Sequence, residues 1–123
     1  MHQLTVSDTF NATHSLTLAE GHAEPVHGHD WRVTAVVRAP TLDAIDTVMD
    51  FHELERLLAG ILAPLQHSHL NDQGAFAGLN PSAERVAMHV AGELAPALPS
   101  HVRLHRLDIE EAPGCVASYF PEP

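Results

Sequence analysis

The sequence predicts an α+β domain in which two helices cover one face of a four-stranded antiparallel sheet. Three observations lead to this prediction. Apolar residues alternate near both ends of the chain, they recur at helical spacing in the middle, and the resulting order is strand, strand, helix, helix, strand, strand. Because 123 residues is an ordinary length for one domain, we expect residues 1–123 to form a single domain.

Two long strands are predicted in the first third of the chain. From Leu4 to His14, apolar side chains and the final histidine share one parity, which is typical of a half-buried strand. A loop rich in Gly, Glu, His and Pro follows at residues 19–26. The second strand is expected from about His27 to Arg38, with its apolar side chains on one face.

Two helices and two further strands are predicted in the rest of the chain. Apolar residues recur every three or four positions over residues 51–65, and Asp50 is suited to cap that helix. A second helix is predicted to start with Asn80 as its cap and Pro81 in its first turn. The remaining strands are expected at roughly 102–111 and 114–120. Such a sheet has two open edges, and pairing between copies would close them, which predicts a homo-oligomer.

Composition narrows the classes of partner. The formal net charge is -10 and all six basic residues are arginines, so the chain should repel nucleic acid and anionic lipid. No apolar run reaches the length of about 18 residues that would suggest a membrane span, and the first residues lack the features of a signal peptide. The single cysteine, Cys115, allows no internal disulfide and is expected to be buried in the last strand. These features predict a cytoplasmic protein that binds a small molecule or another protein chain.

Three histidines have a spacing that suits one metal ion. His27 and His29 are two residues apart in an extended segment, so their side chains point to the same face. His14 ends the neighbouring strand, at the same end of the sheet if the two strands form a hairpin. Three neutral imidazoles suit Zn²⁺ and leave a fourth position for water or substrate. The alternative is coincidence, because the chain has eleven histidines and His67 and His69 repeat the same spacing.

Six short motifs follow one another in an order that is similar to one enzyme family. They are Phe10-Asn11-Ala12-Thr13-His14, His27-Gly28-His29-Asp30-Trp31, Met49-Asp50-Phe51-x-x-Leu54, His67-x-x-Leu70-Asn71, Pro81-Ser82-Ala83-Glu84, and Glu111 eight residues before Tyr119. The series covers nearly the whole chain and resembles the 6-pyruvoyl-tetrahydropterin synthase and 6-carboxy-tetrahydropterin synthase family. The resemblance implies a tunnelling fold (T-fold) that assembles by sheet pairing into trimers and then hexamers. It also implies zinc held by His14, His27 and His29.

The resemblance further implies a pterin substrate and names the residues that would act on it. Glu111 falls at the position of the pterin anchor, and a carboxylate can accept two hydrogen bonds from the guanidine-like edge of the ring. The family's usual catalytic cysteine is replaced by Ala23, and Glu24 follows it. This pattern resembles the subgroup in which glutamate replaces the cysteine and 6-hydroxymethyl-7,8-dihydropterin is formed, so Glu24 is the expected base. The alternatives are that Glu24 is a solvated loop acid, and that the neighbouring Glu110 is the anchor, although strand parity points Glu110 to the other face.

The second proton-transfer residue is expected to be His67. Family members commonly carry an aspartate before this histidine, whereas this chain has Gln66, which can orient an imidazole but cannot stabilise its charged form. A triphosphate substrate also needs cationic contacts, and the chain has no lysine. The sequence does not choose among the candidate arginines, which are Arg32, Arg38, Arg85, Arg103 and Arg106.

The predicted function is therefore that of a zinc-dependent pterin-synthase-like lyase. It would act on the side chain of a dihydropterin such as 7,8-dihydroneopterin triphosphate and release 6-hydroxymethyl-7,8-dihydropterin. One alternative is the 6-carboxy-tetrahydropterin synthase reaction of the deazapurine pathway, against which the missing cysteine argues. The others are a zinc-containing pterin-binding protein without turnover, and a structural oligomer whose site is vestigial.

Overall fold

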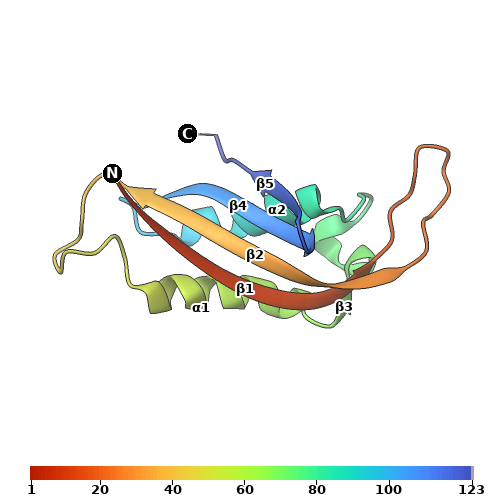
Figure 1. Ribbon diagram of the computed structural model, residues 1–123, viewed down its shortest axis with the longest axis horizontal. Coiled ribbons are helices and arrows are strands. Elements are labelled where there is room, and N and C mark those ends of the chain that lie inside the picture. Colours follow the sequence, from red (N-terminus) through yellow and green to blue (C-terminus); the bar gives the residue numbers. More distant parts are fainter. Residues whose placement is uncertain (123) are drawn as a thin grey trace.

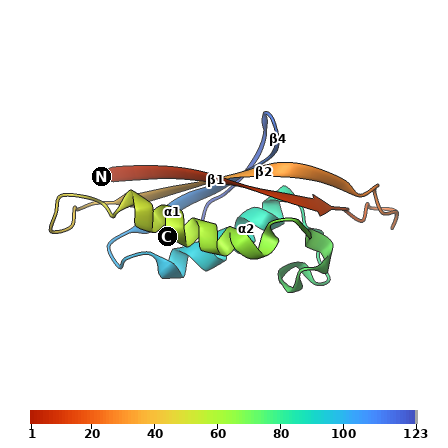
Figure 2. The same ribbon diagram turned by 90° about the horizontal axis from the view of Figure 1, so that it is seen from below.

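A long antiparallel hairpin forms the centre of the molecule in the computed structural model, which describes residues 1–122 (Figure 1). Two further strands extend the sheet on one side and a very short one on the other, in the order β3-β1-β2-β4-β5. The elements are β1 (His2–His14), β2 (His27–Ala39), α1 (Phe51–Leu62), β3 (Ser68–His69), α2 (Ala83–Leu94), β4 (Arg103–Ala112) and β5 (Cys115–Tyr119). Both helices cover the same face of the sheet, as predicted (Figure 2). The structure thus confirms the α+β class and the order of the long elements.

The predicted number of strands was wrong, because the sheet has five strands rather than four. The additional strand, β3, has only two residues and runs parallel to β1, with Ser68 opposite Ala12 and His69 opposite Thr13. The sheet is therefore not purely antiparallel. A two-residue strand carries no periodicity, so a search for alternating side chains does not detect it.

The alternate residues of β1 and β2 that face the helices form part of the core. The register runs from His2 opposite Ala39 to His14 opposite His27 without interruption. The buried parity of the two strands faces the helices, and there Phe10 stacks on Trp31 with ring centroids 5.8 Å apart. This register brings the end of β1 and the start of β2 together at one end of the sheet.

The cap of α1 was predicted correctly and the cap of α2 was not. The side chain of Asp50 accepts a hydrogen bond from the His52 N–H at 2.8 Å and begins α1. In α2 the capping side chain is Ser82, which accepts from the Arg85 N–H, and the helix begins two residues later than Pro81. Asn80 therefore lies outside the helix, where its side chain contacts a different part of the chain.

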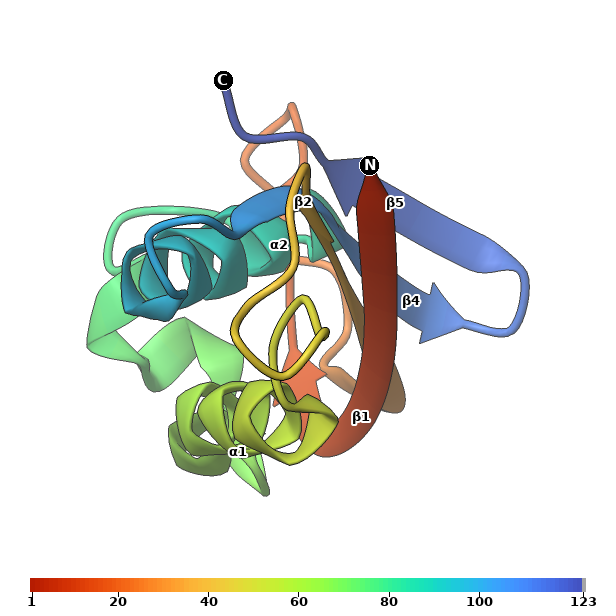
Figure 3. The ribbon, with the colours of Figure 1, turned by 90° about the vertical axis from the view of Figure 1, so that its left-hand side faces the viewer.

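The burial of apolar side chains and the end of α1 differ in detail from the sequence-based expectation. Phe51, the first residue of α1, is 51% exposed, whereas Leu54, Leu58 and Leu62 of the same helix are buried. The last predicted turn of that helix, residues 63–65, is a 3₁₀ turn. Cys115 is exposed rather than buried, since it begins the edge strand β5 next to a turn that lies away from both helices (Figure 3).

Both outer edges of the sheet remain largely open within residues 1–122. There β1 pairs with β3 only at Ala12 and Thr13, and β5 pairs only with β4. Val116 and Phe120 are more than half exposed along the β5 side.

Among the helices of this described part, none is long and apolar enough to cross a membrane.

The loop between β2 and α1 is held by Asp43, which gives a prediction for acid stability. Its carboxylate accepts from the Thr47 hydroxyl at 2.7 Å and from the N–H groups of Thr47 and Ile45. These bonds, the Thr47 hydroxyl first, lower the pKa of Asp43. A lowered folded-state pKa means that the carboxylate stabilises the fold above the unfolded-state pKa of about 3.9, and that this contribution disappears as pH falls through the folded-state pKa.

We therefore expect Asp43→Asn to lower the melting temperature at neutral pH and to match the wild type in strong acid. Thermal unfolding followed by circular dichroism from pH 7 to pH 2 measures the gap between the two proteins. Thr47→Val should reproduce part of the neutral-pH loss, because it removes the hydroxyl donor. A gap that stays constant down to pH 2 would contradict this account.

Candidate functional site

Three imidazole rings meet where β1 ends and β2 begins. His14 lies opposite His27 in the hairpin, and His29 follows two residues later on the same face. The Nε2 atoms of His14 and His27 are 2.8 Å apart, and the ring centroid of His29 lies 4.7 Å from that of His27 and 5.6 Å from that of His14. The hairpin thus brings together the three histidines that the spacing singled out.

The carbonyl contacts of two rings show which nitrogen atom of each ring faces the cluster. His14 Nδ1 is 2.8 Å from the Pro81 carbonyl oxygen, and His27 Nδ1 is 3.0 Å from the Pro25 carbonyl oxygen. A carbonyl only accepts, so each Nδ1 carries the hydrogen, and in a neutral ring Nε2 then carries a lone pair. Two lone pairs at 2.8 Å repel each other unless a cation lies between them. Zinc–nitrogen bonds of 2.0–2.1 Å in a tetrahedron separate ligand nitrogens by roughly 3.3 Å, so a small outward shift of the rings fits the ion.

His29 supplies the third nitrogen and the clearest sign of a missing partner. Its Nε2 atom is buried and has no hydrogen-bond partner within residues 1–122. Burial lowers the pKa of His29, and this outweighs the opposing effect of the nearby Glu111. A neutral ring keeps its lone pair, and a buried polar atom without a partner destabilises a fold unless something binds it. The donor set and this orphaned atom together fit a divalent metal ion.

Glu111 lies at the same cluster. Its Oε1 atom is 2.7 Å from His14 Nε2 and 3.7 Å from His29 Nε2. The neighbouring Glu110 instead accepts a hydrogen bond from the Gly114 N–H in the turn after β4, which agrees with the predicted parity. Ligand atoms of the three histidines and Glu111 all lie within 4.8 Å of one another. Glu111 can therefore reach either a metal ion or a ligand bound beside it.

Glu24 is held beside the cluster by the loop that joins β1 to β2. Its carboxylate oxygen Oε1 lies 3.9 Å from His27 Nε2 and accepts a hydrogen bond from the Leu16 N–H at 3.0 Å. Its backbone carbonyl accepts from the Ser15 hydroxyl, and its side chain is only 25% exposed. The arrangement differs from that of a solvated loop acid, because the carboxylate is half-buried and has a defined direction.

His67 lies outside the cluster. Its side chain is exposed, its φ angle is 56°, and its backbone N–H donates to the Asn11 carbonyl at 2.6 Å. Asn11 precedes His14 by three residues, which places the two backbones roughly 10 Å apart along the strand. Gln66 could have oriented the His67 ring, but its Oε1 atom accepts a hydrogen bond from the Asn11 backbone N–H. Both residues instead contact the outer edge of β1.

Sequence reasoning missed the groups that orient the histidines. The Pro25 and Pro81 carbonyls that bind the Nδ1 atoms are backbone atoms, and no side-chain motif reports them. Gly28, which lies between His27 and His29, leaves room for the Thr13 methyl group across the hairpin, because a Cβ at this position would approach that methyl group to 3.3 Å.

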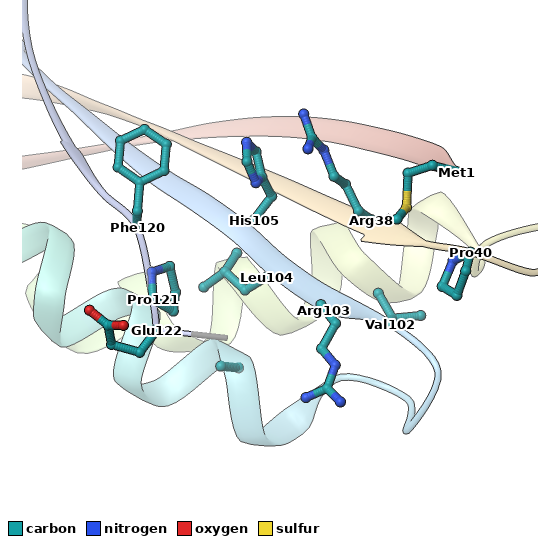
Figure 4. Close-up of a pocket in the computed structure, with 11 residues that line it drawn as sticks. Met1, Arg38, Pro40, Val102, Arg103, Leu104, His105, Phe120, Pro121 and Glu122 are labelled. Atoms are coloured by element: carbon teal, nitrogen blue, oxygen red, sulfur yellow. The ribbon is translucent and has the colours of Figure 1, made fainter.

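Two of the candidate arginines, Arg38 and Arg103, lie far from the histidine cluster. Arg38, Arg103, His105 and Phe120 help line a cavity of about 560 Å³ near the end of β2 (Figure 4). The pKa of His105 is lowered, first by burial and then by the charges of Arg38 and Arg106. Because a strand rises about 3.3 Å per residue, Arg38 lies roughly 36 Å from the start of β2. This cavity is therefore separate from the site built by the histidines.

Comparisons with known proteins agree on one family. Residues 3–122 match the family model described as 6-pyruvoyl tetrahydropterin synthase. A dihydroneopterin monophosphate aldolase from Pyrococcus furiosus is 30% identical over 103 residues, which cover 84% of this chain and 83% of that protein. A putative 6-carboxy-5,6,7,8-tetrahydropterin synthase from Archaeoglobus fulgidus is 30% identical over 92 residues, with 73% of each chain covered. The structure of a Plasmodium vivax 6-pyruvoyltetrahydropterin synthase, in which a catalytic residue, a glutamate, is replaced by alanine, superposes with a TM-score of 0.83 at 16% identity over 99% of this chain and 98% of that one.

Proposed function

The chain belongs to the 6-pyruvoyl tetrahydropterin synthase family, and we propose that it is a zinc-dependent lyase that cleaves the side chain of a dihydropterin. Membership identifies a pterin-synthase-type protein with the tunnelling fold. The observation that carries the finer proposal is the convergence of three imidazoles with two carboxylates at the end of one hairpin. No cysteine lies in this group, since Cys115 is at the start of β5.

The substrate we propose is a phosphorylated 7,8-dihydroneopterin, and the product is 6-hydroxymethyl-7,8-dihydropterin. The Pyrococcus furiosus relative is named for aldol chemistry on dihydroneopterin monophosphate, which supports a carbon–carbon cleavage. The chain carries a net charge of -10 and its cationic cavity is remote from the cluster. A single phosphate is repelled less by such a chain than three phosphates are, so the monophosphate is the better first candidate.

The metal we propose is zinc, held by the Nε2 atoms of His14, His27 and His29. Three neutral nitrogen donors with one open position are typical of a catalytic zinc site. Zinc supplies a Lewis acid that makes the side-chain hydroxyls of the substrate more acidic. The carbonyl partners of His14 and His27 keep both rings in the tautomer that presents Nε2 to the ion.

Glu24 acts as the base in this proposal. It accepts the proton of the hydroxyl on the second side-chain carbon, and the bond between the first and second carbons breaks. The electron pair of that bond moves into the pterin ring, the second carbon leaves as an aldehyde, and a proton added to the first carbon completes the hydroxymethyl group. A glutamate is named as a catalytic residue in the Plasmodium vivax relative, which supports a carboxylate as base.

Glu111 anchors the pterin ring in this proposal. Its partly exposed carboxylate can accept two N–H groups from the ring edge while one oxygen faces the histidines. This arrangement would place the substrate side chain over the three imidazoles, a positioning effect that contributes directly to the rate.

We assign the second proton transfer to His67 of a neighbouring copy. In its own chain His67 lies on the outer side of β1, away from the three rings. The open edges of β1 and β5 can pair between copies, and such a head-to-tail contact closes into a ring. A ring of three, or two rings stacked as a hexamer, would bring the outer side of one β1 next to another copy.

The experiment that tests this function is product identification. Zinc-loaded protein is incubated with 7,8-dihydroneopterin monophosphate and, in parallel, with the triphosphate, and the pterins are separated and identified by mass. We expect 6-hydroxymethyl-7,8-dihydropterin, and none from protein stripped of metal with a chelator. Formation of a 6-carboxy-tetrahydropterin would instead support the reaction named for the Archaeoglobus fulgidus relative. Tight pterin binding without any product would overturn the enzymatic proposal and favour a binding protein.

A further inference from the structure

We propose that Asn71 and Asn80 are positioning residues that hold the loop carrying Glu24 against the histidine cluster. Each carboxamide makes two hydrogen bonds to the backbone of a single loop residue. Asn71 accepts from the Ser15 N–H at 2.9 Å and donates to the Ser15 carbonyl at 2.7 Å. Asn80 accepts from the Thr17 N–H at 2.7 Å and donates to the Thr17 carbonyl at 3.0 Å.

The chemistry of a carboxamide explains this geometry. It offers one accepting oxygen and an NH₂ donor, so it can pair with a backbone as a peptide group of another strand would. Ser15 and Thr17 are alternate residues, and in an extended chain alternate residues present their N–H and C=O groups to the same edge. The two asparagines therefore continue the pairing that β3 begins on the outer edge of β1.

The same outer edge of β1 is also covered at Asn11, four residues before Ser15. At Asn11, the Gln66 side chain accepts from the backbone N–H and the His67 N–H donates to the carbonyl. From Asn11 to Thr17 the backbone groups are thus bound in turn by a side chain, by β3, and by two further side chains. The motif residue Asn71 and the residue Asn80, for which the proposed chemistry has no other use, are accounted for by this role.

The clamp formed by Asn71 and Asn80 holds the two residues on either side of Leu16, which in turn contacts Glu24. Leu16 lies between Ser15 and Thr17, and its N–H donates to Glu24 Oε1 while its carbonyl accepts from the Glu24 N–H at 2.9 Å. The rest of the loop is a small hairpin that projects beyond the end of the sheet (Figure 1) and is closed by its own bonds between Leu18 and His22. Among the hydrogen bonds of residues 1–122, the four carboxamide bonds are those that join the loop to elements outside the β1–β2 hairpin.

A positioning role differs in its consequences from a general structural one. Both asparagines are exposed, so neither side chain contributes to the apolar core. Their loss should loosen the loop and misplace the Glu24 carboxylate while leaving the sheet and the three imidazoles intact. The part of this inference that concerns catalysis rests on the proposed role of Glu24, whereas the clamp itself does not.

The test uses Asn71→Leu, Asn80→Leu and the double variant, because leucine has nearly the same shape and cannot form either bond. Gln73→Leu is the matched control, since Gln73 lies beside Asn71 but donates to the Pro64 carbonyl. Amide hydrogen exchange of the metal-free proteins, read by mass spectrometry, is expected to rise about tenfold or more for residues 15–24 in the double variant and to stay unchanged in β2. Unchanged exchange in residues 15–24 would overturn the clamp, and faster exchange throughout the sheet would replace it by a general structural role.

Turnover provides the second readout. With zinc content equal to the wild type, we expect kcat of the double variant to fall roughly 10- to 100-fold while KM changes little, because a misplaced base slows the chemical step. A rise in KM with kcat unchanged would overturn the link to Glu24. If the wild-type protein cleaves no pterin but the loop exchanges as expected, the proposed function fails and the clamp is still supported.

Discussion

Replacing His29 by alanine is expected to lower the affinity for zinc by more than about 100-fold and to abolish pterin cleavage. Removing a residue that merely orients a metal ligand lowers the metal affinity about 10- to 100-fold, and removing a direct ligand should lower it more. His29 is the most informative of the three histidines, because its Nε2 atom makes no hydrogen bond within residues 1–122 and its removal breaks none. His14, by contrast, is 1% exposed and bonded to the Pro81 carbonyl, so its loss would also disturb folding.

Zinc content after dialysis against a competing chelator, measured by atomic emission, is the appropriate readout. His22→Ala serves as the control, because His22 is an exposed histidine in the adjoining loop. It should bind zinc as the wild type does, which separates the cluster from the general effect of a histidine-rich chain. Equal zinc affinity in the His29→Ala protein would show that the ion binds elsewhere and would remove the basis of the proposed function.

The Glu24→Gln variant is expected to retain zinc and lose about 10²- to 10⁴-fold in turnover, which is the usual contribution of a general base. Glutamine keeps an accepting oxygen for the Leu16 N–H, so the loop should keep its shape. It cannot accept the substrate proton, because an amide oxygen is a very weak base. Steady-state kinetics with the monophosphate substrate, at matched zinc content, measures the effect.

Glu20→Gln is the control for this substitution, since Glu20 is an exposed acid in the same loop. Full activity in the Glu24→Gln protein would refute the assignment of the base.

Mixing inactive Glu24→Gln and His67→Ala subunits then tests the assembly. Recovery of activity after mixing is expected if His67 acts on the site of a neighbouring copy, and no recovery would place both residues in one chain's site.

The long elements were predictable because their signals are local. Alternating parity places β1 and β2 within a few residues, helical spacing places α1, and Asp50 caps it with an N–H two positions away. Where the local signal is ambiguous the prediction failed: Asn80 and Ser82 are both good caps, and the choice of Ser82 follows only once Asn80 is bound to Thr17.

In the candidate site, too, local signals predicted some features, and tertiary contacts decided the others. The convergence of His14, His27 and His29 could be inferred because a hairpin register and strand parity suffice to predict it. The position of His67 could not, because it follows from a tertiary contact with Asn11, 56 residues earlier in the chain. The exposure of Cys115 likewise depended on which strand of the sheet became its edge.

The amino-acid order alone was thus enough to place the fold class, the hairpin and the three histidines that converge at its end, because parity, helical period and caps act between near neighbours. The orientation of those side chains needed the folded chain. The carbonyl that orients His14 is 67 residues away, and the carboxamides that hold Ser15 and Thr17 are 56 and 63 residues away. Hydrogen bonds over such separations depend on how the core packs, so no local pattern in the sequence reports them.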